Sequence, residues 1–273
     1  MNLRESSLPP GWYPRSPQGI AQALSGFSPG ADKASAAICP HAGWYYSGRI
    51  AAAGASLLKN APQTIVVAGG HLPAGYPVLF ALEDAVQTPL GPIPIDAELR
   101  DLLIAELDGH EDRYRDNTVE VLLPMVKHFF PNVSLVWLRL PAEIASFEAG
   151  KTIADCARKL KRDVRVLAST DLTHYGSNYG YSPMGKGEKA LAWMREENDA
   201  RFIQAVGQGR PEKVLECADR DLSCCSAGAV LAAMGFSQST GLAAARLVEY
   251  GTSADNESAV PDSFVGYAAM VFE

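Results

Sequence analysis

Three apolar runs of this chain each lead into a histidine. They are Ala-Ala-Ile-Cys-Pro-His over residues 36–41, Ile-Val-Val-Ala-Gly-Gly-His over residues 65–71, and Arg-Val-Leu-Ala-Ser-Thr-Asp-Leu-Thr-His over residues 165–174. A near-continuous apolar run is typical of a parallel strand that is buried on both faces. In open α/β sheets, ligands collect at the carboxyl edge of such strands. The pattern therefore predicts that His41, His71 and His174 lie just past three strand ends, at one edge of a sheet.

The rest of the pattern alternates between strands and helices. Apolar runs predict strands over 36–39, 64–68, 134–139, 164–168, 244–250 and 265–272. Apolar residues at helical spacing predict helices over 18–24, 47–59, 96–107, 119–130, 143–160, 186–206, 211–217 and 226–234. Ser47 and Asp96 are the expected N-caps of two of these helices.

This alternation predicts an α/β fold, a sandwich in which a central, mostly parallel sheet is flanked by helices. The last strands follow one another without a long helix between them, so part of the sheet is expected to be antiparallel. No linker interrupts the chain, which favours a single domain over residues 1–273.

Composition narrows the function classes. The net charge of −7 argues against a nucleic-acid partner, because phosphate binding needs a basic surface. No apolar stretch reaches the ~18–20 residues of a membrane span, and the first residues lack the apolar core of a secretory signal. The 5 cysteines, an odd number, do not indicate a disulfide framework in a chain of this length. These features favour a cytoplasmic protein that contacts neither nucleic acid nor membrane.

Two of the histidines follow turn-forming residues. Pro40 and Gly43 predict a tight turn that holds His41 rigidly at an opening. Gly69 and Gly70 are expected to let the chain turn with positive φ before His71. Each histidine alone could instead be an ordinary loop residue whose ring binds a nearby carbonyl. Their shared position at one sheet edge favours a functional site.

The third run adds a carboxylate. Asp171 and His174 are three residues apart, a spacing that places them on one face of a helical turn. A carboxylate beside an imidazole selects its tautomer and raises its basicity. Asp171 and His174 are therefore the candidate catalytic pair. The alternative is that Asp171 only caps a helix.

A pair of cysteines, Cys224 and Cys225, precedes a predicted helix of small residues. A thiol at a helix N-terminus meets the positive end of the helix dipole, which lowers its pKa and makes a thiolate available as a metal ligand or nucleophile. The alternative is that both are small apolar residues packed where a loop enters the core.

Several motifs together resemble one known family, the Memo family, also called AmmeMemoRadiSam system protein B. They are Gly-Trp-Tyr-Pro at 11–14, Pro-His-Ala-Gly-Trp-Tyr-Tyr-Ser-Gly at 40–48, Ala-Gly-Gly-His at 68–71, Ser-Thr-Asp-Leu-Thr-His-Tyr-Gly at 169–176, and Asp-Ser-Phe-Val-Gly-Tyr-Ala-Ala at 262–269. The resemblance runs along nearly the whole chain. It implies a fold similar to that of class III extradiol dioxygenases.

The resemblance also implies a ligand set. The family's two histidines and one cysteine correspond to His41, His71 and Cys224, which would hold one metal ion, with Fe(II) or copper as candidates and zinc as a further option. His174 would line the same pocket. A small molecule or peptide in that pocket, and radical-SAM and AMMECR1-type system proteins, are the implied partners. The chain departs from the family in having Asn117 where a pocket histidine is usual.

Three functions are consistent with these residues. The first is a non-haem iron- or copper-dependent oxidoreductase, in which His174, oriented by Asp171, is the general acid or base. Two imidazoles and a thiolate suit Cu(I) and zinc, whereas Fe(II) oxygenases more often include a carboxylate ligand. The second is a non-catalytic metal- or ligand-binding interaction module. The third is a hydrolase with Cys224 as nucleophile, which no oxyanion-hole segment supports.

Overall fold

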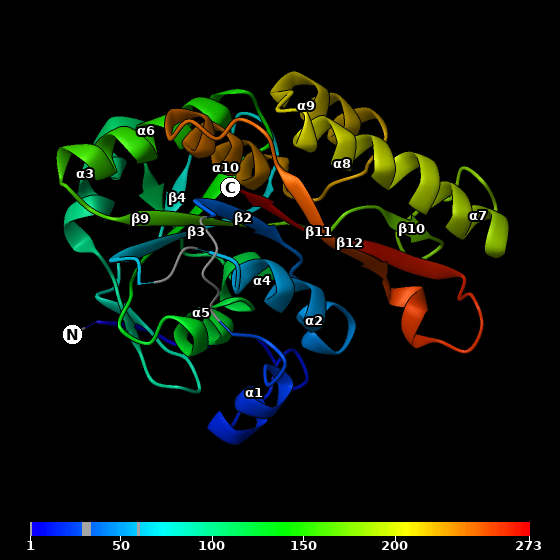
Figure 1. Cartoon of the computed structure of the whole chain (residues 1–273), viewed down its shortest axis with the longest axis horizontal. Coiled ribbons are helices and arrows are strands. Elements are labelled where there is room, and N and C mark those ends of the chain that lie inside the picture. Colours follow the sequence, from blue (N-terminus) through cyan, green and yellow to red (C-terminus); the bar gives the residue numbers. More distant parts are fainter. Residues whose placement is uncertain (1, 29–33, 59–60) are drawn as a thin grey trace.

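Four parallel strands form the centre of the computed structural model, which describes residues 2–28, 34–58 and 61–273 (Figure 1). In spatial order they are β2 (Ala36–Cys39), β9 (Val164–Ser169), β3 (Thr64–Leu72) and β8 (Ser134–Pro141). Each strand pairs in parallel with the next. The carboxyl ends of β2, β9 and β3 therefore lie side by side.

Antiparallel strands extend the sheet beyond β2. The long closing strand β12 (Ser263–Phe272) pairs antiparallel with β2. Two further strands, β10 (His174–Gly176) and β11 (Arg246–Thr252), pair antiparallel with β12. The predictions of an antiparallel part and of a mixed sheet flanked by helices are thus confirmed.

Short strands form the other edge of the central sheet and a small second sheet. Next to β8 lie β4 (Leu79–Phe80) and β7 (His110–Glu111). Within the described part of the chain, the small second sheet contains three strands: β1 (Leu3–Arg4), β5 (Ala85–Val86) and β6 (Ile93–Pro94).

Helices cover both faces of the central sheet, and the strands divide their side chains between two cores. In β2, Ala36 and Ile38 belong to one core and Ala37 and Cys39 to the other, as the two-residue period of a strand requires. On the first face lie α3 (Ala97–Leu107), α6 (Ala145–Lys159), α8 (Asp199–Gly207), α9 (Pro211–Arg220) and α10 (Ala227–Ser239). On the second face lie α1 (Pro17–Ala23), α2 (Trp44–Ala55), α4 (Asn117–Glu120) and α5 (Leu123–Phe129) (Figure 1).

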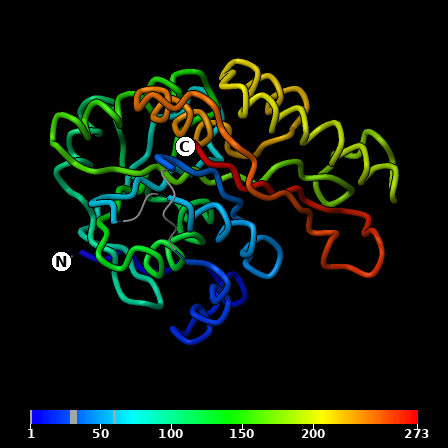
Figure 2. Tube along the Cα trace, in the orientation of Figure 1, coloured from blue at the N-terminus to red at the C-terminus, as the bar shows by residue number. Residues whose placement is uncertain are grey.

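One long helical run is not regular throughout. The helix α7 (Glu188–Trp193) continues through a π-helical turn over Met194–Asn198 into α8. The trace in Figure 2 shows this run and the loop before β12 extending together beyond the end of the central sheet. A short 3₁₀ helix, Ser253–Asn256, follows β11. None of the helices in the described ranges is both long and apolar enough to span a bilayer.

Two predicted helices differ in their bounds. The helix predicted over 119–130 is two helices, α4 and α5, because Pro124 has no N–H to continue the hydrogen-bond ladder. The helix predicted to begin after Ser47 begins at Trp44, and Ser47 donates a hydrogen bond to the Ala42 carbonyl instead of capping. Its predicted end at residue 59 lies outside the described residues.

Candidate metal centre

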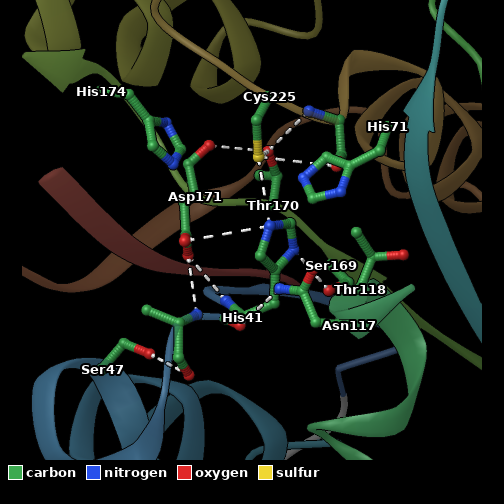
Figure 3. A network of polar contacts seen from close by, with 12 residues as sticks. His41, Ser47, His71, Asn117, Thr118, Ser169, Thr170, Asp171, His174 and Cys225 are labelled. Carbon is green, nitrogen blue, oxygen red and sulfur yellow. Dashed lines mark hydrogen bonds and ion pairs between the residues drawn. The ribbon is translucent and has the colours of Figure 1, made fainter. Parts of the chain in front are cut away.

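Three neighbouring parallel strands bring the predicted histidines to one place. His41 follows the end of β2, and Ser169 and Asp171 lie at the end of β9. His71 lies within the last residues of β3 rather than beyond it. In Figure 3 the rings of His41 and His71 both point toward Cys225. The His41 and His71 ring centroids are 4.9 Å apart, with the rings nearly perpendicular.

His41 is buried and held on three sides. Its Nδ1 shares a hydrogen bond of 2.9 Å with the Ser169 hydroxyl, and its backbone N–H donates to Asp171 Oδ1 at 2.7 Å. Asn117 Nδ2 donates to the His41 carbonyl at 3.1 Å. With Nδ1 engaged by Ser169, the ring directs Nε2 toward the centre.

His71 is more accessible, and a carboxylate fixes its ring. Its Nδ1 donates to Asp116 Oδ2 at 3.0 Å, and the same oxygen lies 3.3 Å from the guanidinium of buried Arg139. Burial alone would lower the pKa of His71, but hydrogen bonds with Asp116 and Cys225 raise it to about 9. Burial would raise the pKa of Asp116, but His71, Thr118 and Arg139 hold it well below its usual range. This carboxylate–histidine pair directs Nε2 inward, as metal-binding histidines require.

The glycines before His71 act differently from the prediction. His71 itself takes the left-handed conformation, with φ of 57°, and neither glycine has positive φ. The glycines allow close approach instead. A Cβ on Gly69 would lie 2.3 Å from Thr118 Oγ1, and one on Gly70 would lie 2.4 Å from Ser226 Cβ. Hydrogen in place of a side chain lets β3 approach α4 at Gly69 and the loop that follows the cysteines at Gly70.

The cysteine that joins the two histidines is Cys225. Its Sγ lies 3.2 Å from His41 Nε2, and one donor atom from each of His41, His71 and Cys225 falls within 4.8 Å of the other two. This corrects the prediction of Cys224. Cys224 contacts the Thr170 hydroxyl at 3.1 Å and packs against the main core, where burial chiefly raises the pKa of its thiol. The two residues precede α10 in an irregular loop, and neighbouring side chains there face different ways.

Asp171 does not orient His174 as predicted. Its Oδ1 accepts from the backbone N–H groups of His41, at 2.7 Å, and Ala42, at 3.3 Å. No helical turn contains Asp171 and His174, since β10 begins at His174. The hydrogen bond that orients His174 is donated from Nδ1 to the Leu172 carbonyl at 3.1 Å. Burial, together with the nearby His41, lowers the pKa of His174 although Asp171 opposes this. Asp171 therefore positions His41, and His174 is a neutral imidazole in the cavity wall.

A cavity of about 650 Å³ opens in front of His41 and His71. Its wall includes His41, His71, Asp171 and His174, so the predicted site residues other than the cysteine border one space. Cys225 borders a separate cavity of about 640 Å³, together with Cys224 and residues of α9. The two histidines thus border one cavity and the cysteine borders another.

The short helix α4 connects the candidate metal centre to the N-terminal segment, residues 6–13. Asp116, its N-cap, binds His71, and Asn117 binds the His41 carbonyl. At its last residue, the buried Glu120 accepts hydrogen bonds from five groups: the backbone N–H groups of Ser7 and Leu8 and the hydroxyls of Ser6, Ser7 and Tyr13. Sequence motifs miss this role of Glu120. Asp116 is missed as well, although its place directly before a helix marks it as an N-cap.

The donor set fits a metal ion. Two imidazole nitrogens and a thiolate are common ligands of zinc, copper and iron. A tetrahedral ion separates its ligands by about 3.3–3.8 Å, so donors within 4.8 Å of one another need only a small contraction. Each histidine has its second nitrogen bound to a hydroxyl or carboxylate, an arrangement that usually accompanies metal ligation.

A mixed α/β fold with two histidines and a cysteine at a sheet edge is the architecture that the sequence motifs indicate. The family model described as "Memo-like protein" matches residues 4–271. The chain therefore belongs to the Memo-like protein family, and the resemblance given by its motifs is confirmed.

Known proteins agree with this membership. A MEMO1 family protein of Pyrococcus abyssi is 32% identical, over 88% of this chain and 87% of its own. Another, from Methanosarcina barkeri, is 29% identical over 99% of this chain and 100% of its own. The crystal structure of the uncharacterized protein JW3007 from Escherichia coli K12 covers 88% of this chain and 100% of its own with a TM-score of 0.51. Its 15% identity makes this a likeness of fold.

Proposed function

We propose that this protein binds a single metal ion through His41, His71 and Cys225 and acts as a mononuclear metal-dependent oxidoreductase on a molecule held in the adjoining cavity. The observation that carries this proposal is the convergence of the three donor atoms within 4.8 Å, each from a different segment of the fold. Such a group costs free energy to assemble, because it places two imidazoles and a thiol together without a ligand. A bound cation compensates for that cost.

The donor set limits the metal. A thiolate with two imidazoles suits copper and zinc, and iron is the further candidate for redox chemistry. When bound, iron or copper supplies an open coordination position and a change of oxidation state. Cytoplasmic placement and the system partners that the resemblance implies remain predictions.

The chain's own residues would bind the substrate and exchange a proton with it. The cavity gives a molecule access to the histidine side of the centre. His174 Nδ1 is occupied by Leu172, so Nε2 is the nitrogen that can take a proton from a bound molecule or return one. Because burial lowers the pKa of His174, its imidazole is neutral near pH 7 and can act as a base. Asp171 contributes by holding the backbone at His41.

Metal analysis tests the binding step. The purified wild-type protein is expected to carry about one ion per chain, since the ligands form one group. His41→Ala should lose the ion, whereas His110→Ala, at an exposed histidine of β7, should keep it. Stoichiometric metal in both His41→Ala and Cys225→Ser would remove the proposed centre.

Oxygen uptake with catechols tests turnover. The metal-loaded wild type should consume oxygen, and His174→Gln should slow uptake while retaining metal. Metal binding with no uptake by the wild type would favour the alternative, a non-catalytic interaction module.

A thiol hydrolase is the second candidate, favoured by the 3.2 Å contact between Cys225 Sγ and His41 Nε2. A catalytic cysteine paired with histidine reacts rapidly with iodoacetamide. Rapid alkylation that bound metal does not slow, together with ester hydrolysis lost in Cys225→Ser, would support the hydrolase over the metal centre.

A further inference from the structure

Away from His71, whose ring is paired with Asp116, the wall of the cavity in front of the histidines is acidic. Among its described lining residues are two carboxylates, Asp171 and Glu257, and neither lysine nor arginine. Asp171 is buried beside His41, at the inner end, and Glu257 is exposed, at the outer end. A ligand that enters therefore passes one carboxylate and approaches another.

Aromatic rings form much of the same wall. Tyr46, in the first turn of α2, and Tyr179, in the loop after β10, line the cavity and remain 45% and 47% exposed. Tyr179 meets His174 edge to face, with ring centroids 4.9 Å apart, and Tyr46 meets Tyr45 in the same way. Large aromatic side chains this exposed leave ring surface free for a partner.

The negative charge of Asp171 acts on two tyrosines of the cavity wall, Tyr179 and Tyr267. Burial, and after it the negative charge of Asp171, raises the pKa of Tyr179. The same two causes raise the pKa of Tyr267, which lines the cavity from β12. The phenols of Tyr179 and Tyr267 therefore stay protonated and neutral, so the negative charge in this part of the wall comes from the carboxylates.

We propose that this cavity recognises an organic cation, a protonated or quaternary amine, whose charged group lies against the rings of Tyr46 and Tyr179 between Asp171 and Glu257. An aromatic ring attracts a cation through the negative potential of its face, and this attraction does not need a counter-charge in direct contact. A volume of about 650 Å³ suits a small organic molecule. An anion, by contrast, would be repelled by both carboxylates.

This inference takes from the proposed function only the location of the cavity beside the histidines. The cation would occupy the tyrosine end of the cavity, so that a donor atom elsewhere on the same molecule could extend toward the metal-facing end. Binding of the cation does not itself require a metal ion, and the two proposals can fail separately.

A matched pair of probes tests the charge requirement. Choline and 3,3-dimethyl-1-butanol have nearly the same shape, but only choline is charged. Ligand-observed NMR titrations of the protein, both as purified and after chelator treatment, should give at least tenfold tighter binding of choline. Phenyl phosphate should not bind the chelator-treated protein. Equal binding of the two isosteres, or binding of phenyl phosphate in preference to choline, would overturn the proposal.

Variants locate the binding surface. Tyr46→Leu and Tyr179→Leu should each weaken choline binding at least fivefold, whereas Tyr46→Phe and Tyr179→Phe, which keep the ring, should stay within twofold of wild type. Tyr114→Leu, at a tyrosine outside the cavity that is 60% exposed, is the matched control. If a Leu variant fails to fold, the comparison of choline with its uncharged isostere on the wild-type protein still tests the proposal. Unchanged binding in both Leu variants would overturn the assignment of this surface, whatever the metal content.

Discussion

Two polar clusters contact the segment 170–174. We call one of them closed, because its polar groups bind one another inside the protein, and the other open, because it borders a cavity. In the closed cluster, buried Asp199 accepts hydrogen bonds from the Thr173 N–H at 3.2 Å, the Thr173 hydroxyl, and the Tyr250 hydroxyl at 2.7 Å. Asn198, at the π-helical turn, donates to Thr173 Oγ1 at 2.9 Å. In the open cluster, His41, His71 and Cys225 direct their donor atoms at one another beside a cavity.

This difference distinguishes polar groups that hold the fold in place from polar groups that are available to a ligand. The closed cluster uses its hydrogen bonds to fix the chain where β9 gives way to β10, and it borders none of the described cavities around the centre. The open cluster uses outer partners, Ser169 and Asp116, to orient rings whose inner nitrogens meet a thiol. A buried polar group with all its partners inside the protein fixes the path of the chain, whereas polar groups that direct their donor atoms at one point are suited to binding a ligand.

The largest expected effect sharpens the assignment of the thiol. Cys225→Ser should weaken metal affinity about 1,000-fold or more, because it removes a ligand rather than a supporting group. Cys224→Ser is the matched control and should change affinity less than threefold. Competition titrations with a chromogenic chelator measure both. A larger loss in Cys224→Ser than in Cys225→Ser would reverse the assignment.

The next effect concerns the closed cluster and pH. Burial chiefly raises the pKa of Asp199 from 3.8 to about 6, although its hydrogen bonds oppose this. The folded state therefore binds the proton more tightly, so this group destabilises the fold fully above pH 6 and progressively less as pH falls toward 4. The cost near pH 7 is about 3 kcal/mol.

Asp199→Asn removes that titration. Its stability advantage over wild type should be largest above pH 6 and fade toward pH 4, as measured by urea unfolding at a series of pH values. Metal affinity should be unchanged. A loss of metal in this variant would break the comparison, since the closed cluster would then belong to the centre.

A smaller effect tests the support of His71. Asp116→Asn should reduce metal affinity about 10–100-fold, the usual range for a carboxylate that orients a metal-binding histidine. Asp101→Asn, at an exposed carboxylate of α3, should have no effect. An affinity equal to wild type in Asp116→Asn would show that Arg139 and the backbone suffice to place the ring.

The smallest effect measures the strain at His71. A non-glycine residue in the left-handed region costs about 1 kcal/mol, and His71 has φ of 57°. His71→Gly should therefore be about 1 kcal/mol more stable to thermal unfolding than His71→Ala, while both lose metal. Equal stabilities would mean that the backbone relaxes when the imidazole is removed.

Much of this site could be predicted from the sequence, because strand ends carry the histidines. Apolar runs mark β2, β3 and β9, and parallel strands must bring their ends to one edge, so His41 and His71 are found without knowledge of packing. The family resemblance supplies a cysteine near residue 224. The choice between Cys224 and Cys225 depends on how an irregular loop is oriented, and no periodicity encodes that.

Other details depend on tertiary contacts that local sequence does not contain. Asp171 and His174 have helical spacing, but the segment is extended and its carboxylate binds the backbone of a different strand. Gly69 and Gly70 signal a special backbone requirement, yet whether glycine provides a turn or a close approach is decided by Thr118 and Ser226, far along the chain. Asp116 is invisible as a partner of His71 until β3 and α4 are placed together.

The helix α4 makes the centre sensitive to events at a distance. At its N-terminal end, Asp116 and Asn117 form hydrogen bonds with His71 and with the His41 carbonyl. At its C-terminal end, Glu120 accepts hydrogen bonds from the N-terminal segment Ser6–Tyr13. Proteolytic clipping of that segment, or an affinity tag fused close to it, would therefore be transmitted through a single helical turn to the metal ligands. Preparations that differ only in their leading residues are expected to differ in metal content.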